Sequence, residues 1–152
     1  MKVSWRAIMW AALSMAMLAF IFGNSLQSGA DSLAISDTVA QIYAPTLERI
    51  GFGDEQISFL VRKLAHFAEF MLLGFLFSGT ARAFSVHRSY LAAVSSGWLA
   101  GAADEFIQRF IDGRSAQVTD VLIDCIGVAA GIGFYCLFFR LSARDRQTKS
   151  VS

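Results

Sequence analysis

Four long apolar segments dominate the alternation of hydrophobic and polar positions along this chain. They cover residues 5–22, 57–84, 90–110 and 118–139. Each is near the roughly 20 residues that a tilted helix needs to cross a bilayer. Strands are excluded there because unpaired backbone groups find no partner in lipid. The pattern predicts an all-α bundle of four transmembrane helices, forming a single domain over residues 1–152 with a basic tail at 140–152.

The stretch between the first two apolar segments is the only long polar connection, and it contains a weaker periodic signal. Apolar residues recur there at near-helical spacing behind Asp31 and Ser32, either of which is a suitable N-cap. Pro45 and the Gly51–Gly53 pair are typical stop signals. We expect a short amphipathic helix on the outer surface, with an apolar face made of Leu33, Ile35, Val39, Ile42 and Tyr43.

Composition supports a membrane protein. Of the 152 residues, 55% are hydrophobic and one is a proline, whereas soluble domains are about 45–50% apolar. The net charge of +1 gives no reason to expect nucleic acid as a partner. Cys125 and Cys136 lie eleven residues apart in one predicted helix, a rise of roughly 16 Å, which is too far for a disulfide.

The distribution of basic residues predicts the orientation. With a cytoplasmic N-terminus, eight of the 13 basic residues lie on the inner side, as the positive-inside rule requires. Both termini are then cytoplasmic. The basic start, the apolar run from Ile8 to Phe22 and the small residues Ser28 and Ala30 are also typical of a cleaved signal. We expect the first helix to be retained, because the three helices left after its removal would have the wrong parity to keep the basic tail in the cytoplasm.

Ionisable residues interrupt three of the four apolar segments. Each costs roughly 2.5–3.5 kcal/mol near the bilayer centre, so such residues are usually paired and functional. Within each segment they recur at spacings of three or four and share one helical face. In the predicted topology all three faces lie in the outer half of the membrane. We predict one polar site there, built from Lys63, His66, Glu69, Asp104, Glu105, Gln108, Asp120 and Asp124.

Two runs of the sequence resemble the motifs of VanZ-like membrane proteins, a family named for teicoplanin resistance. They are Arg62–Gly74 (RKLAHFAEFMLLG) and Asp104–Arg114 (DEFIQRFIDGR), the second followed by Asp120. The resemblance covers most of the chain and implies a protein of the bacterial cytoplasmic membrane with a role at the cell envelope. The family usually has proline at Asp112 and asparagine at Asp124, so this chain departs at both positions.

The residue inventory suggests recognition of, or action on, a membrane lipid or lipid-linked cell-wall precursor. Candidate catalytic residues are His66, Glu69, Asp104 and Glu105, with His66 as base or nucleophile. Candidate substrate-binding residues are Lys63, Gln108, Arg109, Arg114, Asp120 and Asp124. An enzyme of phosphoryl-lipid hydrolysis or transfer is the first alternative. Arg62 is interpreted as snorkelling to the headgroups.

Three other interpretations remain open. The charged groups could form salt bridges that only set helix register, for example Lys63 with Asp104 and Arg109 with Glu105. Ion or proton transport would need polar groups in the inner half, where the sequence offers only small ones such as Ser78 and Thr80. A metal would use the five carboxylates with His66; because there is one such histidine and no HExxH pair, we predict no metal or cofactor. The oligomeric state is not determined.

Overall fold

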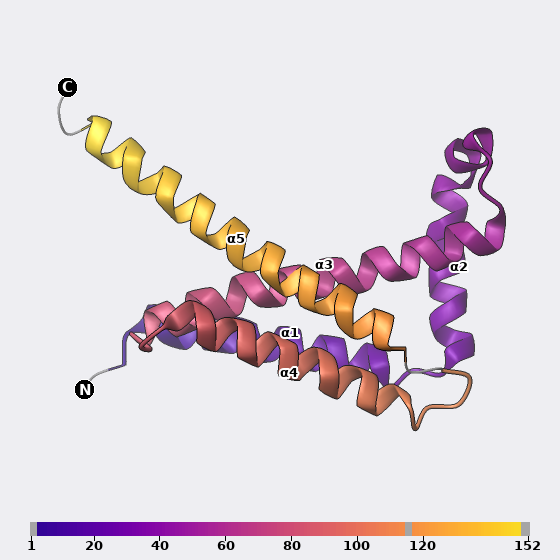
Figure 1. Cartoon of the computed structure of the whole chain (residues 1–152), viewed down its shortest axis with the longest axis horizontal. Coiled ribbons are helices and arrows are strands. Elements are labelled where there is room, and N and C mark those ends of the chain that lie inside the picture. Colours follow the sequence, from indigo (N-terminus) through magenta and orange to yellow (C-terminus); the bar gives the residue numbers. More distant parts are fainter. Residues whose placement is uncertain (1–2, 115–116, 150–152) are drawn as a thin grey trace.

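The computed structural model describes residues 3–114 and 117–149, and all its regular elements there are helices. Four long helices lie lengthwise, and one shorter helix stands across one end of them (Figure 1). We call this end, where α2 lies, the α2 end. The elements are α1 (Trp5–Ser25), α2 (Gly29–Leu47), a short 3₁₀ turn η1 (Glu48–Ile50), α3 (Asp54–Ala83), α4 (Ser89–Gln108) and α5 (Val118–Lys149).

The four lengthwise helices share one apolar core. Small residues let α3 and α5 approach closely: Gly131 packs on the carbonyl of Met71, and a Cβ at Gly127 would lie 2.7 Å from the Phe67 carbonyl oxygen. Close backbone approach through small residues is how helices associate in lipid, where apolar burial gives little driving force. The core cluster is Ile21, Phe70, Leu73, Ala93, Ala100, Val128 and Ile132.

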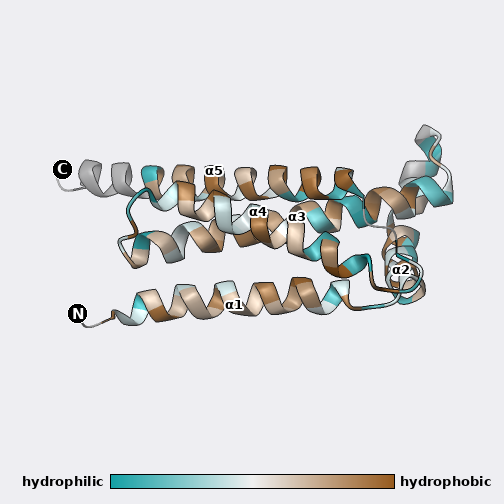
Figure 2. Cartoon of the chain, turned by 60° about the horizontal axis from the view of Figure 1, so that its bottom comes forward, coloured by the Kyte–Doolittle hydropathy of each residue, from teal (hydrophilic) through white to brown (hydrophobic). Residues whose placement is uncertain are grey.

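Three helices are long and apolar enough to cross a membrane: α1, α3 and residues Val118–Leu141 of α5. Hydrophobic residues cover α1 and α5, whereas hydrophilic residues gather toward the α2 end of α3 and α4 (Figure 2). The predicted all-α class is therefore confirmed for the described residues, and three of the helices have the length and composition of membrane spans. The predicted span at 90–110 is helix α4, but serines, glycines and the acidic pair near its end keep it outside this set.

Several predicted boundaries were wrong. Helix α2 begins at Gly29 because the Ser28 hydroxyl caps it by accepting the Asp31 N–H at 3.2 Å. Pro45 does not stop α2, since in the last turn a proline removes only one backbone hydrogen bond. Helix α5 continues to Lys149, through most of the predicted tail. The apolar side chains expected on one face of α2 are all exposed in the structure: Leu33, Ile35, Val39, Ile42 and Tyr43.

Candidate functional site

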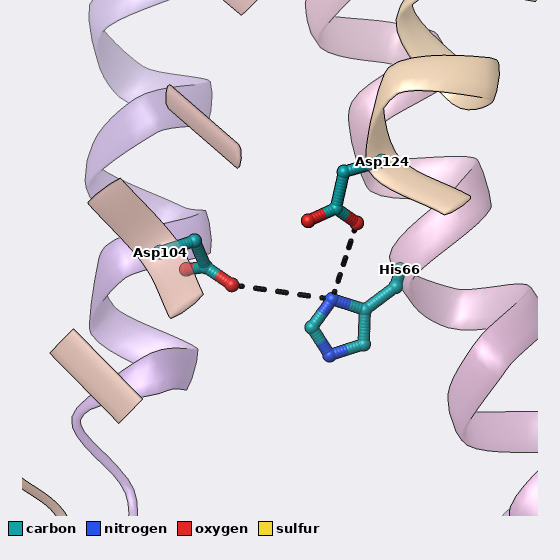
Figure 3. Close-up of side chains that lie close together, drawn as sticks. All are labelled: His66, Asp104 and Asp124. Atoms are coloured by element: carbon teal, nitrogen blue, oxygen red, sulfur yellow. Dashed lines mark ion pairs between the residues drawn. The ribbon is translucent and has the colours of Figure 1, made fainter. Parts of the chain in front are cut away.

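Three ionisable side chains from three helices meet near the α2 end. His66 comes from α3, Asp104 from the last turns of α4 and Asp124 from the second turn of α5. Both carboxylates are directed at the Nδ1 atom of the same imidazole ring (Figure 3). The Nδ1 atom lies 3.5 Å from an Asp124 oxygen and 4.0 Å from an Asp104 oxygen. We call these three residues the His66 cluster.

Asp104 is held in place by two neighbours. The Ser25 hydroxyl at the end of α1 donates a short hydrogen bond to one carboxylate oxygen. The Gln108 amide, one turn further along α4, donates to the other oxygen at 2.8 Å. Asp104 is completely buried, so these two donors repay part of the cost of removing its charge from water.

Asp124 lacks such support. Its side chain is also completely buried, yet neither oxygen accepts a hydrogen bond. The Nδ1 atom of His66 and one oxygen of Glu105 are likewise buried without a hydrogen-bond partner. Because most buried polar atoms in proteins are satisfied, each exception calls for an explanation. Here the exceptions gather around one histidine and its acidic neighbours.

The remaining acids of the site do have partners. Lys63 forms a short ion pair with Asp120 at the start of α5. Asn24 donates to Glu69 at 3.0 Å, and the Gln117 backbone N–H donates to Glu105 at 2.9 Å. The ion pair predicted between Lys63 and Asp104 is therefore wrong: Lys63 pairs with the acid one turn before Asp124.

Arg114 joins the loop after α4 to the end of α1. Its guanidinium donates to the Asn24 carbonyl at 3.0 Å and to the Gln27 carbonyl at 3.2 Å, which fixes the loop against the C-terminus of α1. Burial lowers the pKa of Arg114, while nearby Asp104 raises it. Arginine stays charged at physiological pH in either case, so the site keeps this cation.

Two cavities adjoin the cluster, and Arg62, His66 and Arg114 line both of them. The smaller has a volume of about 60 Å³ and also contacts Lys63 and Asp120. The larger, about 380 Å³, runs between α1, α2 and α3. Beside it lies an apolar groove of about 600 Å³ between α2 and α3, which shares Ile35, Ser36 and Ala65 with the larger cavity.

Nine of the ten predicted site residues line these cavities or lie buried next to the His66 cluster. Arg109 does not: it is exposed, lines neither cavity and makes no ion pair with Glu105 in the described structure. Conversely, Arg62 was not among the predicted site residues, although it lines both of these cavities and a third one of about 750 Å³, which lies between α2 and the first half of α3. Its place next to Lys63 was the available signal, but we interpreted it as snorkelling.

A helical membrane protein with a buried polar cluster between its helices is the class that this fold and site define. Residues 10–139 match the family model described as VanZ/LLP1. The chain therefore belongs to the VanZ/LLP1 family, as its two motifs indicated. No curated protein and no solved structure shows significant similarity to the chain.

Proposed function

We propose that this protein recognises an envelope lipid, or a lipid-linked cell-wall precursor, through the phosphate of its headgroup. The observation that carries the proposal is the position of Arg62 and its lack of a bonding partner in the described part of the chain. Arg62 is half-buried where three cavities meet, and it makes no hydrogen bond or ion pair within residues 3–114 and 117–149. A guanidinium offers five donors in a planar fork that fits a phosphate, so Arg62 is available to an anionic headgroup.

The adjoining apolar groove favours a lipid over a soluble phosphate. It is lined by apolar side chains of α2 and α3, among them Ile35, Val39 and Leu64. Because it shares Ile35, Ser36 and Ala65 with the larger cavity, a ligand whose phosphate contacts Arg62 can lay an acyl or polyprenyl chain between the two helices. Such a lipid chain would also cover apolar residues of α2 that are otherwise exposed.

Lipids that co-purify with the protein test this proposal. A charge-assisted hydrogen bond contributes about 1.5–3 kcal/mol, so Arg62→Gln should lower the amount of a specific bound phospholipid at least tenfold by mass spectrometry. Arg109→Gln is the matched control, because Arg109 lies at the same end of the bundle but outside the cavities. Equal lipid recovery from both variants and wild type would contradict the proposal.

Hydrolysis or transfer of a lipid phosphate is a second candidate, supported by the orientation of His66. The two carboxylates lie on the Nδ1 side of the ring, and the other ring nitrogen lies on the opposite side (Figure 3). An imidazole oriented by a carboxylate in this way is suited to act as a general base. Purified protein should then release phosphate from a lipid panel, and His66→Ala should abolish the release. Absence of turnover across the panel would count against catalysis.

We also propose the bacterial cytoplasmic membrane as the location, with α4 as a fourth span and both termini inside. The excess of basic residues on that side supports this orientation. A cysteine replacing Asp112 should react with a membrane-impermeant thiol reagent in intact cells, and one replacing His87 should not. If the ligand is a wall precursor, overproduction of the protein should also change the teicoplanin concentration that inhibits growth.

A further inference from the structure

We propose that His66, Asp104 and Asp124 form a binding site for one divalent transition-metal ion, with Zn²⁺ preferred over Mn²⁺. One ligand atom from each residue lies within 4.8 Å of the other two. Ligand atoms around a tetrahedral zinc ion, with bonds near 2.0–2.2 Å, lie about 3.3–3.5 Å apart. The observed 3.5 Å and 4.0 Å separations from Nδ1 are close to this, and the carboxylate ligand atoms lie within 4.8 Å of each other, so an inward movement of the side chains brings three ligands into this range.

The missing hydrogen bonds around Asp124 are an independent reason to expect a cation. Its carboxylate is completely buried, points at His66 (Figure 3) and has no donor for either oxygen. Leaving a buried polar group unsatisfied costs about 1–3 kcal/mol, and more for a charged group. Asp120 and Asp104 do not share this condition, because Lys63 pairs with Asp120 and Gln108 donates to Asp104. A metal ion would provide a partner to both Asp124 and His66 Nδ1.

The charge balance of the site leads to the same conclusion. With His66 neutral, five acidic side chains face three basic ones, which leaves two negative charges in a largely buried region. Uncompensated buried charge is strongly unfavourable, and one divalent ion removes the imbalance. The groups counted are Glu69, Asp104, Glu105, Asp120 and Asp124 against Arg62, Lys63 and Arg114.

The ligand set selects the type of metal. One imidazole and two carboxylates suit Zn²⁺ or Mn²⁺, and zinc binds such sites more tightly than manganese. Ca²⁺ prefers six to eight oxygen ligands, and Mg²⁺ an octahedral shell with several waters. Ser25 and Gln108, which hold Asp104 through hydrogen bonds, correspond to the outer partners that orient metal ligands.

Three protein ligands leave one coordination position open, as in zinc sites that bind water or substrate. His66 lines both cavities, whereas its Nδ1 atom and the two carboxylates are buried, so a ligand in a cavity reaches the open position only when side chains of the cluster move. An ion at this place would bind a phosphate oxygen together with Arg62. This last step rests on the proposed lipid function; the metal site itself does not depend on it.

Calorimetric titration of the full chain in detergent, after treatment with a chelator, tests the site. We expect one Zn²⁺ per chain, weaker Mn²⁺ binding and no measurable Mg²⁺ binding at the same concentrations. Losing an outer partner typically costs 10–100-fold in affinity, so Asp124→Asn, which removes a direct ligand, should weaken Zn²⁺ binding by at least about 100-fold. Asp112→Asn is the matched control, because it removes an exposed carboxylate at the same end of the protein that is not part of the site, and it should stay within a few-fold of wild type.

A spectroscopic measurement keeps the proposal testable if Asp124→Asn does not fold. Wild-type protein loaded with Co²⁺ should give the intense visible absorption of a four-coordinate ion with one imidazole and oxygen ligands. A spectrum of hexa-coordinated cobalt, no saturable Zn²⁺ binding, or equal Zn²⁺ affinity in Asp124→Asn and wild type would each overturn it.

The metal site and the lipid function can fail separately. Arg62→Gln should lose the lipid and keep Zn²⁺, because Arg62 is not among the ligands. Removing the metal should lower lipid binding in wild type if both proposals hold. Zn²⁺ binding without any metal effect on lipid binding would retain the site and overturn only its link to the lipid.

Discussion

The two ends of the bundle treat their polar groups differently. At the end away from α2, Trp10, Phe75 and Tyr135 pack with ring centroids 5.3–6.0 Å apart. The polar side chains there are satisfied: Ser14 and Thr80 share a hydrogen bond of 2.9 Å. At the α2 end, His66, Glu105 and Asp124 all have buried atoms without a hydrogen bond.

This difference indicates that the two ends are optimised for different purposes. The end away from α2, which we call the packing end, uses close contact of rings and small residues, and this favours a single rigid arrangement. The α2 end keeps charged groups that a purely structural bundle would replace by apolar residues at no loss of stability. Proteins commonly accept such a cost where a ligand binds. The comparison therefore supports a ligand site at the α2 end.

The largest effect is expected from Lys63→Met at the α2 end. It leaves Asp120 without its ion-pair partner, and removing one member of a buried pair costs about 3–5 kcal/mol. We expect about 3 kcal/mol, because the N-terminus of α5 still favours a negative charge. Unfolding in mixed detergent micelles measures this loss. The double variant Lys63→Met with Asp120→Leu should recover most of it; if it does not, the ion pair is not the cause.

The packing end is tested by a pair of glycines on α5. Gly131→Val places a side chain on the Met71 carbonyl, whereas Gly133 has nothing within 4 Å of where a Cβ would be. Overpacking costs about 1–3 kcal/mol, so Gly131→Val should lower the free energy of unfolding by at least about 2 kcal/mol. Gly133→Val should lower it by much less. Equal effects would mean that helix propensity, not close approach, dominates.

Asp124→Asn should stabilise the metal-free protein, whereas the two variants above destabilise it. In metal-free protein this variant removes a buried charge that has no hydrogen-bond donor. We expect the free energy of unfolding to rise by about 1–2 kcal/mol, measured with chelator present. The same variant should lose any stabilisation that wild type gains from added Zn²⁺. A clear loss of stability in chelator would show that Asp124 serves the fold rather than a ligand.

Ser14→Ala, at the packing end, should have the smallest effect. It removes the hydrogen bond to Thr80, and such a bond contributes about 1 kcal/mol. Because Thr80 also donates to the Leu76 carbonyl at 3.0 Å, no group is left entirely unpaired. The expected loss is about 1 kcal/mol in thermal unfolding, and Zn²⁺ and lipid binding should be unchanged. A change in either binding would mean that the two ends are coupled.

The sequence predicted the composition of the site better than its contacts. Helical rise and periodicity placed His66, Asp104 and Asp124 at similar depth on one face each, and the structure brings them together. The same reasoning chose the wrong partner for Lys63, because depth does not determine how each helix is rotated against its neighbours. That rotation depends on packing such as Gly131 against Met71.

The two arginines illustrate this limit most clearly. Arg109 was included as a basic residue at the outer face that could hold a phosphate, but it lies one residue beyond the helix and is exposed. Arg62 was excluded as a headgroup anchor, yet it lines three cavities. Both are adjacent to predicted site residues. Only the position of α2 across the end of the bundle distinguishes them, because α2 forms walls of the larger cavities beside Arg62.

The all-α class, the apolar helices and the acids and bases carried at one depth follow from the sequence alone, because hydropathy and a 3.6-residue repeat act within a single helix. The tertiary structure decided which of those charges are paired and which buried atoms are left without a hydrogen bond. Lys63 joined Asp120, Ser25 joined Asp104, and neither oxygen of Asp124 received a hydrogen bond. Such pairing depends on contacts between helices distant in sequence, which no pattern within one helix specifies.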